Sequence, residues 1–254
     1  MQKTSIRKNV LYSLAPVFVV IMFFVLMEWA IIAFKIPTWL IATPSRTFKT
    51  MFSNFGQIWP DLAITLQEIF LGYIIGVTFG ITLALIFTGN QFLDRAVSPY
   101  VIFLIVTPQI IMVPLLMLWM GYGIQVKILA VSLSSFPINM MSTMTGVRSV
   151  SIERYELMKS LRATKLQTFF RVLIPSALPN VFTGMRLATI FATTSAVGAE
   201  LISGNTGVGP RISYFTEFMQ VENAFTYVYL MVTVGVLFYT LIGFCENQVI
   251  KWSR

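Results

Sequence analysis

The feature that most constrains this chain is a succession of six long apolar runs separated by shorter polar segments. A helix needs about 20 mainly apolar residues to cross the hydrocarbon core of a bilayer. Only 11% of the residues are charged, against about 25% in soluble domains, so the chain has too little polar surface to cover itself in water. We therefore expect an all-α membrane protein of about six transmembrane helices, at residues 10–34, 62–88, 96–120, 124–146, 180–203 and 224–250.

The composition also excludes several kinds of chemistry. The chain has no histidine, which removes His-based acid–base catalysis, His metal ligands and the Ser–His and Cys–His nucleophile pairs. Its single cysteine, Cys245, can form neither an internal disulfide nor a thiolate cluster, and we expect a small buried residue there. No G-x-x-x-x-G-K-[ST] phosphate loop occurs. We expect no metal and no bound cofactor, and no enzymatic activity in this chain alone.

The basic residues are distributed unevenly between the two sides of the expected membrane. Six spans place both chain ends on one side, with Arg95 and the polar segment 148–176, and this side carries twelve of the 18 Lys and Arg residues. Arg186 falls within a span. By the positive-inside rule, we expect both termini and the segment 148–176 to be cytoplasmic. The opposite side carries five, at Lys35, Arg46, Lys49, Lys127 and Arg211.

Glycine and proline positions add detail to the spans. Gly72, Gly76 and Gly80 are four residues apart, so they share one helix face and suit close helix packing within or between subunits. Pro108 and Pro114 are expected to break the span 96–120.

The chain is expected to form a single transmembrane domain, 1–254. Residues 1–60 would supply an uncleaved first span and an extracytoplasmic segment, in which 45–52 has the spacing of a surface helix. Residues 61–252 would form the core.

The polar segment 148–176 is much longer than most connections between helices. Its apolar residues have helical spacing, which predicts two short amphipathic helices with a turn near Arg162. Their apolar side needs a partner. Spacing alone leaves two possibilities open, the lipid surface and a cytoplasmic protein.

Within this segment, Glu156 to Pro175 resembles the "EAA" loop of permease subunits of binding-protein-dependent ABC importers. That pattern is Glu-Ala-Ala, three residues, Gly, nine residues, then Ile-x-Leu-Pro. Glu156 stands at the Glu position, and Val172, Ile174 and Pro175 stand at the last three defined positions with the spacing kept. The likeness extends from about residue 61 to 252. Glu200 and the Gly207-Val-Gly209 sequence look most like the nitrate/taurine/alkanesulfonate branch.

The resemblance implies a type I importer fold, a location in a bacterial inner (cell) membrane and a mechanism. Two permease copies, most simply a homodimer, would enclose a path for a small polar nutrient delivered by an extracytoplasmic binding protein. Two ATPase subunits, which bind ATP and Mg²⁺, would act on the loop of each permease. The residues of the ATPase-coupling loop would be Glu153, Tyr155, Glu156, Leu157, Met158, Leu161, Arg162, Ala163, Thr164 and Pro175.

This sequence departs from the family pattern at three positions of the loop. Leu157 and Met158 replace the Ala-Ala pair, and Arg162 replaces the Gly that makes the turn between the two helices. A non-Gly residue at positive φ costs about 1 kcal/mol or more. Arg162 either occupies a reshaped turn or pairs with an acidic group on the ATPase, and a related second permease in a heterodimer is a further possibility.

Polar residues within spans are candidates for the translocation path. Glu200, Asn139 and Gln109 are the candidates, with Glu200 either a gate or a structural hydrogen-bond partner. Glu28 and Glu68 are expected in the outer parts of their spans, within reach of interfacial water. The competing interpretations are a secondary transporter with its own ion coupling, an intramembrane enzyme and a membrane scaffold, and the substrate cannot be read from the sequence.

Overall fold

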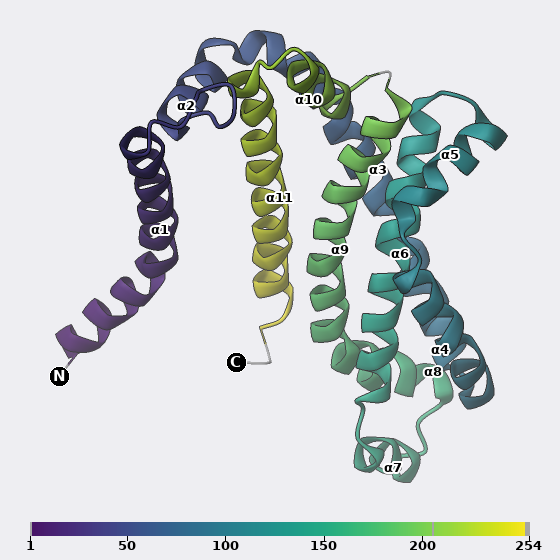
Figure 1. Cartoon of the computed structure of the whole chain (residues 1–254). Coiled ribbons are helices and arrows are strands. Elements are labelled where there is room, and N and C mark those ends of the chain that lie inside the picture. The colour runs from purple at the N-terminus through teal and green to yellow at the C-terminus, as the bar shows by residue number, and fades with distance from the viewer. Residues whose placement is uncertain (1, 205, 252–254) are drawn as a thin grey trace. The chain divides into compact units, whose positions relative to one another are not determined.

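The computed structural model describes the backbone of residues 2–204 and 206–251, and within them the side chains of residue 15 and of residue 17 onward. These residues form α-helices and one π-helix, with no strand in the ranges described (Figure 1). The helices are α1 (Gln2–Ala33), α2 (Pro44–Ser53), α3 (Phe55–Thr88), α4 (Gln91–Val106), α5 (Gln109–Met120), α6 (Ile124–Arg148), α7 (Ile152–Ser160), α8 (Lys165–Thr168), the π-helix η1 (Phe169–Leu173), α9 (Ile174–Ser203), α10 (Val208–Glu217) and α11 (Val221–Val249).

The described chain divides into two compact units. Unit 1 comprises Met1–Ile58 with Arg211–Leu230, and unit 2 comprises Trp59–Pro210 with Met231–Arg254. One boundary falls close to the expected limit of the N-terminal segment at residue 60. The inclusion of 211–230 in unit 1 was not anticipated from the sequence.

Unit 1 joins α1 and α2 to the first part of α11. The rings of Phe24, Phe48 and Tyr229 form a cluster with centroids 5.5–5.8 Å apart. Glu28 accepts hydrogen bonds from the backbone N–H (3.0 Å) and the hydroxyl of Ser45, in the first turn of α2. A carboxylate is favoured there because helix N-termini present free N–H groups and a partial positive charge.

Unit 2 is built on the contact between α6 and α9, which lie side by side in Figure 1. Small residues bring them close: a Cβ added at Gly146 would stand 2.7 Å from the Asn180 Cβ, and one at Gly184 would stand 2.6 Å from the Ser142 Cβ. The glycine face of α3 packs on α6 in the same manner. Cβ atoms at Gly72 and Gly80 would each meet α6 atoms at 2.5 Å. The glycines therefore serve packing within the chain and are no evidence for a dimer interface.

Among the residues that the structure describes, three helices, α3, α6 and α11, are long and apolar enough to cross a membrane. The number rises to as many as five if two bent pairs, α4 with α5 and 165–203 with α10, each count as one span. The sequence predicted about six. The remaining predicted span lies in α1, whose searched apolar part, Val17–Ala33, is shorter than a full span.

One proline marks a sharp bend at which a side chain replaces the lost backbone donor. The pair α4–α5 is bent by 91° at Thr107–Pro108, as predicted. Pro108 cannot donate to the Leu104 carbonyl, and the Gln109 side chain donates to it instead at 2.7 Å. Pro114, predicted to be a second break, lies inside α5.

Three further predictions need correction. The second short helix of the segment 148–176 is not separate, because α8, η1 and α9 follow one another without a gap. Residues 208–210 lie between the expected spans 180–203 and 224–250, where no helix was expected, yet they begin α10. Cys245, expected to be buried, is exposed on α11.

Candidate functional site

A buried ion pair joins α3 to the first turn of α6. The Nζ atom of Lys127 lies 2.8 Å from Oε1 of Glu68, and their side chains are 2% and 0% exposed. The same Nζ donates to the backbone carbonyl of Thr206 at 2.7 Å and to its hydroxyl at 3.0 Å. Lys127 therefore ties three segments together, α3, α6 and the turn after α9. We call Glu68, Lys127 and Glu200 the charge cluster.

Glu200, the third member of the charge cluster, is completely buried near the end of α9. Its Oε1 accepts from the Thr65 hydroxyl at 2.6 Å, and its Oε2 accepts from the backbone N–H of Gly209 at 2.7 Å. The Thr65 hydroxyl in turn accepts from the N–H of Val208 at 3.0 Å. Both carboxylate oxygens are thus satisfied within the chain, which removes most of the cost of burying them.

The glycines that follow α9 are required by this carboxylate. Gly207 has φ 104°, and a Cβ there would lie 1.8 Å from Oε1 of Glu200. A Cβ at Gly209 would lie 2.6 Å from the Glu200 Cβ and 2.8 Å from the Leu201 nitrogen. A side chain at residue 207 would displace the Glu200 carboxylate and be strained at this φ, and one at residue 209 would displace the backbone of α9. Glu200 and Gly207-Val-Gly209 therefore form one structural unit, in which the turn packs closely around the carboxylate.

Two sequence expectations fail at the charge cluster. Glu68 was expected at interfacial water, and Lys127 was counted among the loop charges that orient the chain, yet both are buried and paired. The signal was available, since a lysine in the first turn of an apolar helix needs a buried acid if it does not reach water. Without Lys127, four basic residues remain in the segments assigned to the outer side.

Asn139 and Gln109, predicted for the path, have partners within the chain. Asn139 is fully buried between α6 and α9, where it donates to the Val181 carbonyl at 3.4 Å. Gln109 closes the gap at the α4–α5 bend. Their role in a path, like that of Glu200, stays a prediction.

The predicted coupling loop lies at the other end of α6 and α9, where α7 projects beyond both helices (Figure 1). We call residues 148–176 the hairpin. No residue of α7 is buried. Leu157 and Leu161, one helical turn apart, are 59% and 66% exposed, whereas Met158 is half-buried.

The turn that follows α7 has the left-handed backbone conformation that favours glycine, although this chain has Arg162 at that position. Arg162 has φ 52°, in the left-handed region. The backbone N–H of Ala163 donates to the Met158 carbonyl at 2.9 Å, which closes the turn. Thr164 then caps α8 in a capping box with Gln167. The predicted turn is confirmed, and Arg162 occupies its strained position.

The remaining loop residues have local roles. Glu153 is fully exposed in the first turn of α7, and hydrogen bonds from its own backbone and from Ser151 lower its pKa below the ordinary value. Partial burial raises the pKa of Tyr155. Glu156 is exposed. Pro175, the second residue of α9, cannot donate to the carbonyl of Arg171, and the π-helix η1 ends directly before α9.

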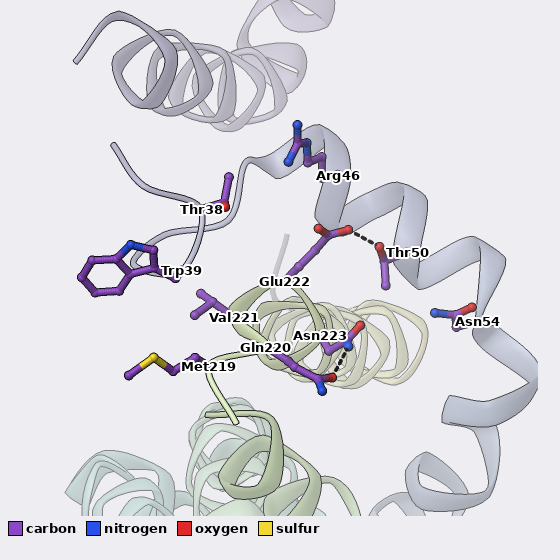
Figure 2. A pocket seen from close by; sticks show the side chains of 10 residues that line it. All are labelled: Thr38, Trp39, Arg46, Thr50, Asn54, Met219, Gln220, Val221, Glu222 and Asn223. Atoms are coloured by element: carbon purple, nitrogen blue, oxygen red, sulfur yellow. Dashed lines mark hydrogen bonds between the residues drawn. The ribbon is translucent and has the colours of Figure 1, made fainter. Parts of the chain in front are cut away.

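Unit 1 contains a separate polar cleft of ≈ 460 Å³ between the segment 38–54 and the turn 219–223 (Figure 2). Glu222 accepts a hydrogen bond from the Thr50 hydroxyl, and Asn223 donates to Gln220 at 2.9 Å. Such a polar lining suits a surface that faces water rather than lipid. None of the predicted site residues lines this cleft.

The comparisons with known proteins identify the family. Residues 76–252, which include the hairpin and two members of the charge cluster, match the model of the family described as binding-protein-dependent transport system inner membrane component. The chain belongs to this family. It is thus a multi-pass membrane permease, which favours the importer over the secondary transporter, the enzyme and the scaffold.

Curated relatives agree with the predicted branch. The chain is 30% identical to the formylaminopyrimidine transport permease protein ThiX of Halalkalibacterium halodurans over 222 residues, 85% of this chain and 87% of the relative. It is 27% identical to the putative aliphatic sulfonates transport permease protein SsuC of Bacillus subtilis over 208 residues, covering 82% and 75%. The taurine transport system permease protein TauC of Escherichia coli is 30% identical over 165 residues, covering 65% and 60%.

Solved structures show the same fold. An amino acid ABC transporter solved with histidines superposes with a TM-score of 0.65 at 17% identity, covering 79% of this chain and 98% of that chain. The MetNI methionine ABC transporter in an inward-facing conformation gives 0.55 at 25% identity, covering 79% and 96%. The predicted type I importer permease fold is confirmed.

Proposed function

We propose that this permease forms half of the membrane path of an importer driven by separate ATPase subunits, and that it moves a small polar nutrient delivered by an extracytoplasmic binding protein. The observation that carries the proposal is the hairpin. It presents Leu157 and Leu161 to solvent on a helix that projects past the ends of α6 and α9. Exposed apolar residues on a projecting helix suit docking into a groove of another protein.

The ATPase is the partner that fits this surface best. The chain has no phosphate loop of its own, so the energy for import must come from another subunit. Within the hairpin, α8 continues through η1 into α9 without a gap, and the hairpin starts at the last residue of α6. A force applied to α7 therefore reaches the two central helices of unit 2 directly. Such a lever can bias a pore between two states if the ATPase binds them differently.

The orientation follows from the basic residues. Both termini and the hairpin would face the cytoplasm, because their side of the membrane holds twelve basic residues against four on the other once the buried Lys127 is set aside. An impermeant thiol reagent applied to whole cells tests this. In a Cys245→Ser background, a cysteine at Thr38 should be labelled and one at Lys159 should not. The reverse pattern would overturn the orientation.

A second permease copy would complete the path, most simply an identical one. The glycine face of α3 no longer supports this, because α6 occupies it. The support is the family alone. Mass measurement of the complex in detergent checks the proposal, and a complex with one permease would contradict it.

The decisive experiment measures the ATPase recovered with tagged permease from membranes. Leu157→Asp and Leu161→Asp should release the ATPase, because a charge at the centre of an interface is left unpaired and costs several kcal/mol. Lys159→Asp is the matched control, since residue 159 points to the opposite side of α7 from residue 157. Full recovery with both Leu variants would mean that the hairpin lies on lipid and that the proposal is wrong.

A further inference from the structure

Where α6 ends and the hairpin begins, an ion pair ties this junction to the first turn of α4. Arg148 is the last residue of α6, and its guanidinium forms a bidentate ion pair with the Asp94 carboxylate. Nε lies 2.9 Å from Oδ2, and Nη2 lies 2.8 Å from Oδ1. This is the geometry in which an Arg–carboxylate pair is most directional.

Ser98 extends the contact along α4. Its hydroxyl donates to the backbone carbonyl of Asp94 and accepts from Nη2 of Arg148. Asp94 also lies in the first turn of α4, where a carboxylate is favoured by the helix dipole. The Arg148 side chain therefore spans a full turn of α4 and fixes both the position and the rotation of its end.

At the other end of the hairpin, the start of α9 is held to α6 by packing. A Cβ at Gly146 would stand 2.9 Å from the Ala177 carbonyl oxygen, so the end of α6 and the start of α9 are in backbone contact. Arg154 of α7 donates to the Ser176 hydroxyl at 2.7 Å. The end of α6, the start of α9 and α7 are thus one connected block, and Arg148 is its polar link to α4.

The structure of α4 would allow the whole helix to move when Arg148 pulls on its first turn. Val101 packs with Met140 and Met144 of α6 in a buried cluster. Beyond Val106 the chain bends by 91° at Thr107–Pro108, where the backbone hydrogen-bond ladder is already interrupted. Helix motions concentrate at such interruptions because no regular hydrogen bond has to break.

We propose that Asp94 and Arg148 are positioning residues that transmit movement of the hairpin to α4, which then tilts about the bend at Thr107–Pro108. The inference rests on the proposed function, in which the ATPase moves the hairpin. The pair is partly exposed, with side-chain exposures of 38% for Arg148 and 17% for Asp94. A pair of that kind adds little to folding stability, so a transmission role can be separated from a structural one.

The chain offers a matched control. Arg186 of α9 pairs with Glu246 of α11 at 3.2 Å, with exposures of 31% and 20%. This pair is also an Arg–carboxylate contact of similar burial, with a single contact in place of two, and its residues belong to helices other than α4 and the hairpin. Glu246→Gln should therefore alter packing to a similar extent without affecting transmission.

The test uses the permease–ATPase complex with spin labels at Tyr100 of α4 and Thr183 of α9, both exposed, in a Cys245→Ser background. Pulsed electron paramagnetic resonance measures the distance between them with and without ATP. In the otherwise unmodified complex, ATP should shift the distance. Asp94→Asn and Arg148→Gln should lose this shift while ATPase recovery and thermal unfolding stay unchanged. Asp94→Glu should keep the shift, as should Glu246→Gln.

The outcomes separate the inference from the proposed function. A full shift in both Asp94→Asn and Arg148→Gln would overturn the inference alone. Loss of the shift in Glu246→Gln as well would show a general packing effect and would also overturn it. If the unmodified permease recovers no ATPase, the proposed function fails and the inference falls with it.

Discussion

The two ends of α6 and α9 differ in which side chains they bury: one end buries charged groups, and the other exposes apolar ones. At one end, the charge cluster buries two carboxylates and an ammonium group, and the partners of Glu200 and Lys127 all come from the same chain. At the other end, the hairpin exposes leucines that no part of the described chain covers. In the first region the charged groups find their partners within one subunit, apart from Oε2 of Glu68, which accepts no hydrogen bond from the described residues, whereas under the proposed function the second region needs another protein to cover it. The difference assigns stability to the charge cluster and communication to the hairpin.

The most severe test of this contrast removes the buried cation. Lys127→Met keeps the length of the side chain but leaves Glu68 buried with no counter-charge, which should lower the free energy of unfolding by about 3–5 kcal/mol. The unfolding midpoint in detergent, followed by tryptophan fluorescence, measures this. Adding Glu68→Gln should recover part of the loss, because the unpaired charge is then gone. A single variant as stable as the original protein would show that the cluster does not hold the fold.

Two glycine substitutions test whether the close packing of the turn on the Glu200 carboxylate stabilises the fold. Both Gly204 and Gly207 have positive φ, at 68° and 104°, but only Gly207 has the carboxylate where a Cβ would lie. Gly207→Ala should cost about 2–4 kcal/mol, from backbone strain together with overpacking. Gly204→Ala, which meets open space, should cost about 1 kcal/mol from strain alone. Equal losses of stability in the two variants would mean that the positive φ, and not contact with the carboxylate, accounts for the glycine at residue 207.

At the hairpin the expected effects on the permease itself are smaller. Arg162→Gly places the family residue at φ 52° and removes strain of about 1 kcal/mol, offset in part by the greater freedom of glycine in the unfolded chain. Hydrogen exchange at the Ala163 amide, which closes the turn, should slow. If Arg162 also pairs with an acidic group of the ATPase, recovery of the ATPase should fall although the turn is firmer. Unchanged recovery would mean that the turn only accommodates Arg162.

The same contrast explains what the sequence could predict. Apolar runs located α3, α6 and α11 because a bilayer imposes length and composition directly. The turn at Arg162 was predictable because its spacing from Glu156 and Pro175 is kept. For the charge cluster, the sequence could indicate that Lys127 needs an acid but not that the acid is Glu68, because the two are far apart in sequence and only tertiary packing brings them together. The π-helix was missed because apolar spacing predicts a helix without distinguishing its hydrogen-bond pattern, and α10 was missed because Gly207, Gly209 and Pro210 favour a turn.

The smallest expected effect is the one that isolates communication from stability. In the isolated permease, Leu157→Asp and Leu161→Asp should change the free energy of unfolding by less than about 0.5 kcal/mol, because neither side chain is buried. Met144→Asp, at a completely buried position of α6, provides the contrast and should prevent folding, because it places a charge among apolar side chains. Thermal unfolding of purified permease without ATPase measures all three. If the two Leu variants unfold as early as Met144→Asp, the hairpin is part of the core of this chain. If they unfold with the original protein and still lose the ATPase, their leucines are needed for the partner alone.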